Sequence, residues 1–136
     1  MADVIALAEV VASALSRFGA VVSLVPEFEL RDLKEMRVVV APLGLGHTMR
    51  ARGIREDGLK VQVGVLKRCS EAELPSLVAT VESIGLSLLH KTVADARCTD
   101  VKYEPLYHAP HFRERKQFTG VVELTFKEIV RHEPHG

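Results

Sequence analysis

Two groups of basic residues have the types and spacing best suited to binding an acidic partner. They are Arg50, Arg52 and Arg55 in one glycine-rich segment, and Arg113, Arg115 and Lys116 in a second polar segment. The planar guanidinium group of arginine forms paired hydrogen bonds with carboxylates and phosphates. Three interpretations follow for these segments: contact with a phosphate backbone, pairing with carboxylates of a neighbouring subunit, or an ordinary solvated loop.

The acidic residues that such pairing would need are present in the same chain. A charged connection upstream of the first basic group carries four of them: Glu27, Glu29, Asp32 and Glu35. The whole sequence has 18 basic and 18 acidic residues, so its formal net charge is zero. A neutral chain lacks the field that draws proteins to nucleic acids. We therefore favour pairing between subunits, and expect the first basic group and the four acids at a subunit interface or lumen.

Motifs for catalysis, metal binding or cofactor binding are weak in this sequence. Gly44-Leu45-Gly46 is followed by His47-Thr48, which supplies neither the lysine of a phosphate loop nor the third glycine of a dinucleotide-binding turn. His108-Ala109-Pro110-His111 and His132-Glu133-Pro134-His135 each enclose a proline, which disfavours a helix that would join two imidazoles on one zinc ion. The sequence predicts no enzyme, no metal site and no cofactor.

Hydrophobic periodicity predicts two amphipathic helices that would position these segments. Asp3 is a suitable N-cap, apolar residues then recur every three or four positions, and Gly19 ends the pattern. Ser70-Glu71-Ala72-Glu73 has the form of a capping box, and a second helical pattern follows it to residue 88. Pro75 falls in the first turn of this second helix, where proline is tolerated.

The remaining apolar segments predict strands at residues 21–25, 36–41, 59–66, 101–103 and 118–130. Leu43 to Gly58 has four glycines and no clean period, so we expect a long loop or an extended hairpin arm there. Tyr107 to Lys116 is expected to be a second surface excursion. Few helices separate the strands, which favours an α+β domain over residues 1–136. Its mostly antiparallel sheet of four to five strands would carry both helices on one face.

The cysteines and the apolar segments bear on where the chain acts. Cys69 and Cys98 are too few for a disulfide framework, and we expect two reduced thiols in a cytoplasmic protein. The longest apolar run falls short of the roughly 20 residues that a membrane-spanning helix needs. The sequence therefore predicts no association with a membrane.

Taken together, the order and spacing of these elements resembles the small neck and tail-completion proteins of tailed phages, above all the tail terminators of siphophages and related prophages. The residues that carry the resemblance are the first helix, Val25–Leu33 with Met36–Pro42, the loop with Arg50 and Arg52, Val61–Arg68, the second helix and Phe118–Phe126. The resemblance implies a structural virion protein without an active site. It would form a ring, commonly a hexamer, that caps the tail tube, ends its polymerisation and offers the surface for head attachment.

The same resemblance implies the partners and the location of the chain. The partners would be further copies of the chain, the tail tube protein and the head–tail connector or neck proteins, with DNA passing through the lumen without sequence-specific binding. The location would be the virion neck and, during assembly, the host cytoplasm. A head–tail joining or head-completion protein is a close alternative. A small ligand-binding domain or enzyme using the Gly44–His47 loop, or a nucleic-acid-binding module, would belong to a different class.

Overall fold

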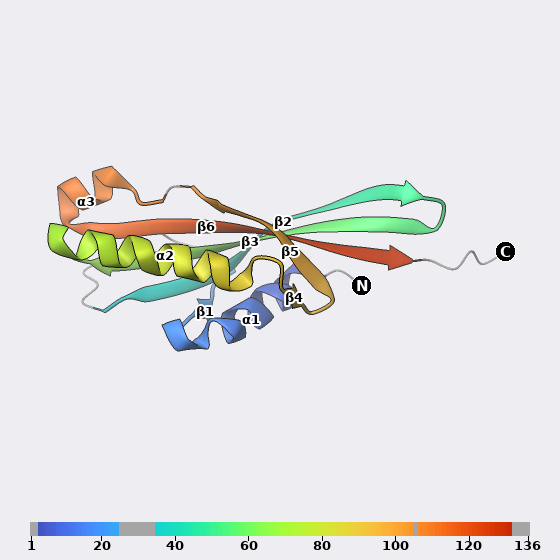
Figure 1. Ribbon diagram of the computed structural model, residues 1–136, viewed down its shortest axis with the longest axis horizontal. Helices are drawn as coiled ribbons and strands as arrows, with labels where there is room; N and C mark the ends of the chain where they lie inside the picture. Colours follow the sequence, from blue (N-terminus) through green and yellow to red (C-terminus); the bar gives the residue numbers. More distant parts are fainter. Residues whose placement is uncertain (1–2, 25–34, 105, 132–136) are drawn as a thin grey trace.

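The computed structural model describes residues 3–24, 35–104 and 106–131 of the chain (Figure 1). The elements follow one another as α1 (Val4–Ala14), a 3-10 turn (Ser16–Phe18), β1 (Val21–Val22), β2 (Arg37–Ala51), β3 (Ile54–Arg68), a 3-10 turn (Glu71–Glu73), α2 (Leu74–Leu88), β4 (Thr92–Val93), β5 (Ala96–Tyr103), α3 (Ala109–Arg115) and β6 (Gln117–Arg131).

A single mixed sheet of six strands, in the order β1-β2-β3-β6-β5-β4, is the framework of the described residues. All neighbouring strands are antiparallel except β1 and β2, which are parallel. The α+β class predicted from the sequence is confirmed. The predicted count of four to five strands was too low because β4 has only two residues, and the prediction of two helices missed α3.

Both long helices contribute to one core on one face of the sheet. Along β3, Leu59, Val61, Val63 and Val65 share one face of the strand and are almost fully buried. Residues of α1 and of α2 belong to the same cluster, among them Leu7, Val11, Val81 and Ile84. Burying a valine or leucine side chain contributes about 1.5–3 kcal/mol, so this two-layer packing is the main stabilising term of the body.

The ends of the helices confirm the capping signals. The Asp3 carboxylate accepts hydrogen bonds from the amides of Ile5 and Ala6, each at 3.0 Å. Gly19 has φ 71°, the left-handed conformation that glycine adopts readily, and it closes the 3-10 turn after α1. Ser70 and Glu73 form the capping box ahead of α2, and Lys67 holds the Glu73 carboxylate at 2.5 Å.

The sequence analysis expected either a long loop or an extended hairpin arm from Leu43 to Gly58, and the structure has the hairpin arm. Strand β2 runs on through Pro42 to Ala51, and β3 begins at Ile54. The distal halves of β2 and β3, together with the end of β6, extend past α1 and α2 (Figure 1). We define the arm as residues 43–60 of the β2–β3 hairpin together with residues 125–131 of β6.

The predicted excursion from Tyr107 to Lys116 contains the helix α3. Pro110 lies in its first turn, where the missing amide costs no helical hydrogen bond. His108 is its N-cap, and its Nδ1 accepts a hydrogen bond of 3.3 Å from the amide of His111. The expectation that a proline between these histidines disfavours a helix was therefore wrong at this position. Among the described residues, no helix is long and apolar enough to cross a membrane.

Candidate assembly surface

The arm is a three-stranded ribbon whose two faces carry different side chains. Across the ribbon, His47 of β2 lies opposite Asp57 of β3, and Asp57 lies opposite Glu128 of β6. One residue further toward the tip, Thr48 lies opposite Glu56. Side chains alternate between the two faces of a strand. Those of His47, Asp57 and Glu128 therefore lie on one face of the ribbon, and those of Thr48 and Glu56 lie on the other.

On the face that continues the helix-covered side, Asp57 is held by an arginine and a histidine. Its carboxylate accepts hydrogen bonds from Nε of Arg55 at 2.7 Å and Nη2 at 3.2 Å, and Nδ1 of His47 lies 2.5 Å away. The side chain of Asp57 has no exposed surface. The hydrogen bond from Arg55 lowers the pKa of Asp57 by more than burial raises it, so the carboxylate stays ionised at neutral pH.

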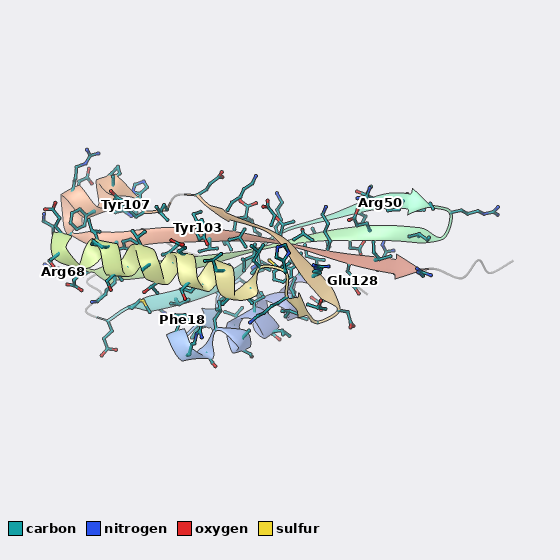
Figure 2. All side chains as sticks on the ribbon, in the orientation of Figure 1. Phe18, Arg50, Arg68, Tyr103, Tyr107 and Glu128 are labelled. Carbon is teal, nitrogen blue, oxygen red and sulfur yellow. The ribbon has the colours of Figure 1, made fainter. Side chains whose placement is uncertain are left out.

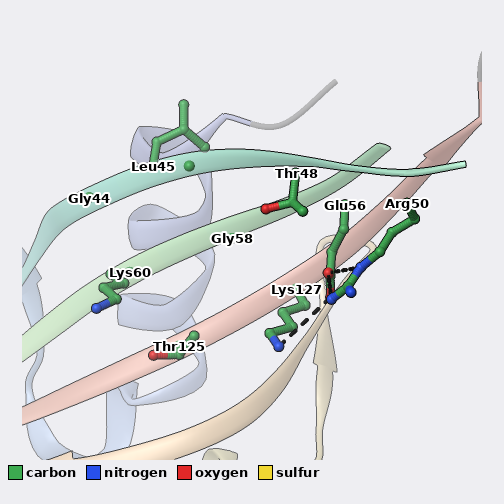
Figure 3. A pocket seen from close by; sticks show the side chains of 10 residues that line it. Gly44, Leu45, Thr48, Arg50, Glu56, Gly58, Lys60, Thr125 and Lys127 are labelled. Carbon is green, nitrogen blue, oxygen red and sulfur yellow. Dashed lines mark hydrogen bonds and ion pairs between the residues drawn. The ribbon is translucent and has the colours of Figure 1, made fainter. Parts of the chain in front are cut away.

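On the opposite face, Glu56 lies between two cations. It accepts a hydrogen bond of 2.5 Å from Nε of Arg50, and Nζ of Lys127 lies 3.8 Å from its second carboxylate oxygen (Figure 3). Lys60 pairs at 3.2 Å with Glu123 of β6. These pairs join β2, β3 and β6 through side chains in addition to the backbone ladder, which favours a defined shape for the arm.

A shallow groove of about 460 Å³ runs along this second face. Gly44, Gly46 and Gly58 form its floor, where the missing side chains leave backbone exposed. Thr48 and Thr125 add hydroxyl groups (Figure 3). The lining therefore offers hydrogen bonds, charges and open space for side chains of a bound partner.

The three arginines of the first basic group lie on the arm but differ in their partners. Arg50 and Arg55 are bound by Glu56 and Asp57 of the same chain, two acids that the sequence analysis did not select. Arg52 lies at the exposed hairpin tip, and no ion pair reaches it within the described part of the chain. The run of charged residues from Arg55 to Asp57 was the feature of the sequence that could have indicated these two acids. Only the strand register shows which of the charged side chains form pairs.

The other candidate residues lie away from the arm. Glu35 is exposed just before β2, whereas Glu27, Glu29 and Asp32 lie outside the described residues. Arg113 and Arg115 belong to α3 and Lys116 is its C-cap, at the end of the molecule opposite the arm tip (Figure 1). The ammonium group of Lys116 lies 5.0 Å from the ring centre of Phe112. The two basic groups therefore do not form one patch.

The arm also has strand edges without a neighbouring strand among the described residues. Strand β1 pairs with β2 only at Val39 and Val40, and the outer edge of β2 beyond them is open as far as Ala51. On the other side, the pairing of β5 with β6 ends at Lys127. Exposed apolar side chains follow both open edges: Leu43, Leu45, Met49 and Ile129.

The remaining candidates for chemistry lie in the body. The rings of His108 and His111 have centroids 4.0 Å apart. No group of three or more metal-ligating side chains occurs among the described residues. Cys69 and Cys98 are free and buried, and burial raises the pKa of both thiols. In comparisons with known proteins, no family model matched the sequence and no curated protein matched it.

Proposed function

We propose that this chain is a structural assembly protein that forms a ring, and that its role is that of a phage tail terminator. The observation that carries the proposal is the arm, in which the distal halves of two 15-residue strands project past the helices and are joined by the end of β6. A long open edge with exposed apolar side chains is a surface that other chains can pair with. The charges on its two faces are largely matched within the chain, which leaves the edges and the tip for contact between subunits.

In this role the ring caps the end of the tail tube, stops its polymerisation and offers a surface to the neck proteins. Two different edges on one protomer support the ring, because a heterologous contact that repeats around an axis closes into one. DNA would pass through the lumen without sequence-specific contacts. A head–tail joining protein of the same neck is the closest alternative, because it would use the same kind of contact.

The experiment that tests the proposal measures assembly and tube binding separately. Light scattering over a concentration series gives the mass of the assembly, and electron micrographs show whether it is a closed ring. Purified tail tubes are then mixed with the protein and sedimented. We expect rings of about six subunits, as the resemblance implies, that cap one end of the tubes. A chain that neither forms rings nor binds tubes would contradict the tail-terminator role.

A second candidate function uses the groove floored by glycine. Its lining combines the hydroxyl groups of Thr48 and Thr125 with the cations Lys60 and Arg50, for which a small anionic ligand would compete with Glu123 and Glu56 (Figure 3). A ligand that binds only the folded chain raises its melting temperature in proportion to the logarithm of the ligand concentration. A thermal-shift series with inorganic phosphate and with citrate checks this function. A shift with either anion, together with a monomeric chain, would favour the ligand-binding function over the ring.

A further inference from the structure

We infer that the arms of two copies of this chain join edge to edge, with the outer edge of β2 in one copy receiving the end of β6 from the next. The inference deepens the proposed function and rests on it, because a ring needs an interface between copies. The partner is therefore a second copy of the same chain. The argument depends on which backbone groups the two edges present and on which side chains would meet.

The backbone groups that β2 presents to its outer edge follow from its register. The carbonyl of Val40 accepts a hydrogen bond of 2.8 Å from the amide of Ser23, so Val40 faces outward. The backbone amide and carbonyl of its partner Val63 therefore point away from β2. The same holds for every second residue of β3 toward the tip. The β2 residues opposite those positions direct both their amide and their carbonyl group to the open edge; they are Leu45, His47 and Met49.

The same alternation gives the groups that β6 presents. The carbonyl of Val121 accepts a hydrogen bond of 3.0 Å from the amide of Glu104, so the backbone amide and carbonyl of Val121 point toward the β5 side of the sheet. Every second residue of β6 does the same, and the register of β6 with β3 is unbroken as far as Arg131. Ile129 and Arg131 lie past the last pair with β5, and they present amides and carbonyls that no described strand receives.

The side chains of the two edges are complementary when two arms lie side by side at the same level. His47 and Glu128 both lie opposite Asp57, so they share one level, and Met49 shares a level with Val130. A neighbouring copy would therefore place a carboxylate beside an imidazole and an isopropyl group beside a thioether. Arg50 and Glu128 lie on the two outer strands of the arm, as this contact requires (Figure 2).

On the groove face, the contact would cover exposed apolar surface. Ile129 is 54% exposed, and its side chain lies on the same face as Gly46 and Gly58. A Cβ atom at Gly46 or at Gly58 would meet no atom within 4 Å, so there is room for a side chain from outside. Ile129 of the second copy would fill that space. The first five residues after Gly44 include no lysine, arginine, aspartate or glutamate, so the edge lacks the lysines that block unwanted pairing in other sheets.

The geometry also sets how the copies are arranged. β2 and β6 are both antiparallel to β3, so they run in the same direction within the arm. Two arms that point the same way therefore join through a parallel pair of strands. Because the two edges differ, each copy keeps one open edge after the first contact, and the contact repeats from copy to copy. Pairing of β2 with β2 would instead give an antiparallel dimer that stops at two.

Proline variants test the two edges separately. Proline is tolerated on an edge strand where the amide it removes faces outward. Met49→Pro removes one outward amide of β2 at the level of Val130, and Ile129→Pro removes one of β6. Met49→Leu and Ile129→Val are the matched controls, because they keep the amide and an apolar side chain. Circular dichroism and melting temperature establish that each variant is folded before its mass is measured by light scattering.

We expect the wild type and both control variants to associate as concentration rises and each proline variant to remain a monomer. A mixture of the two proline variants should form a dimer and nothing larger, since each retains the edge that the other lacks. Normal association of Ile129→Pro would overturn the inference, as would a mixture that stays monomeric. A wild type that is still a monomer at about 1 mM, where contacts weaker than about 4 kcal/mol are lost, would also overturn it.

Cysteine cross-linking tests the contact without proline, in case a proline variant does not fold. Met49→Cys and Val130→Cys are prepared separately and then mixed under mild oxidation. Residues beside each other on paired strands are close enough for a disulfide. We expect a cross-linked dimer from the mixture and from neither variant alone; cross-linking of Met49→Cys with itself would favour β2–β2 pairing instead. Tail-tube binding is scored separately, so a cross-linked junction without tube binding would refute the phage role alone.

Discussion

His47 and Asp57 face each other across the arm, with Nδ1 of the imidazole 2.5 Å from a carboxylate oxygen. His47 is half exposed, whereas the side chain of Asp57 has no exposed surface. Arg55 reaches the same carboxylate from its own strand. The carboxylate of Asp57 is therefore the centre around which this face of the arm is organised.

Replacing Asp57 with asparagine should destabilise the folded chain by about 1–3 kcal/mol, the cost of losing hydrogen bonds between charged groups in a buried setting. Asparagine keeps the size of the side chain but removes its charge, so the ion pair with Arg55 is lost. Urea unfolding gives the free energy of unfolding. His47→Gln is the matched control and should cost less, since the bonds from Arg55 remain. A loss in His47→Gln as large as in Asp57→Asn would assign the effect to the imidazole.

The stability of the wild type should fall at acid pH in a way that Asp57→Asn does not. The hydrogen bond from Arg55 is the largest cause that lowers the pKa of Asp57. A carboxyl whose pKa is lower in the folded chain contributes its full stability above the pKa of the unfolded chain, about 3.9, and loses it as the pH falls further. Urea unfolding of both proteins from pH 7 to pH 2 should show their difference shrinking below about pH 4. A constant difference over this range would contradict the assignment.

Gly85 should resist the alanine substitution that usually stabilises a helix. Alanine in a helix interior is favoured over glycine by about 1 kcal/mol. A Cβ at Gly85, however, would lie 2.4 Å from the hydroxyl of Tyr103 and 2.7 Å from a methyl group of Val101. We expect Gly85→Ala to be destabilised by about 1–3 kcal/mol, as overpacked cores are. Thermal unfolding measures this, and adding Tyr103→Phe should recover part of the loss; a higher melting temperature for Gly85→Ala would contradict the packing.

Neither thiol should react with an alkylating reagent in the folded protein. Burial raises the pKa of Cys98 and of Cys69, and the thiol rather than the thiolate is then the dominant form at neutral pH. Iodoacetamide labelling followed by mass spectrometry should show both sites unmodified without denaturant and both modified in urea. Cys69→Ser and Cys98→Ser identify which site reacts. Rapid labelling of either site in the folded protein would show that it opens locally.

Reversing the charge at the arm tip should weaken assembly without unfolding the chain. Arg52 lies at the exposed hairpin tip, so Arg52→Glu should leave the melting temperature unchanged and lower the mass measured by light scattering. Arg113→Glu makes the same change of charge on α3, at the other end of the molecule, and is the matched control. Normal assembly of Arg52→Glu, or an equal effect of Arg113→Glu, would count against a role for the tip.

The sequence predicted the elements that have one buried face. The alternation from Leu59 to Leu66 indicated a strand because helices cover one side of β3 there. The capping residues Asp3 and Ser70 predicted where helical structure begins, since they supply oxygen atoms to amides that lack partners. These signals are local, and local hydrogen bonds or burial decide them.

The arm and its ion pairs could not be predicted in the same way. Every residue of β2 from Leu45 to Ala51 is exposed, so no apolar alternation marks this part of the strand, and the glycines were typical of a loop. Pro42 suggested the end of a strand, but it lies at an edge where an amide is not needed. The pairs of Arg50 with Glu56 and of Lys127 with Glu56 depend on register between strands, which the sequence does not express.

The position of β3 in the middle of the sheet has a consequence for the order of folding. Its pairing with β2 is a hairpin closed by a short turn, whereas its pairing with β6 joins residues 54 and 131, with α2, β5 and α3 between them. Contacts so distant along the chain form slowly, because a long loop must first be closed. The β2–β3 hairpin should therefore form early, with the edge of β3 that later pairs with β6 still unpaired. Until β6 arrives, a growing chain exposes that side of β3 to any strand nearby.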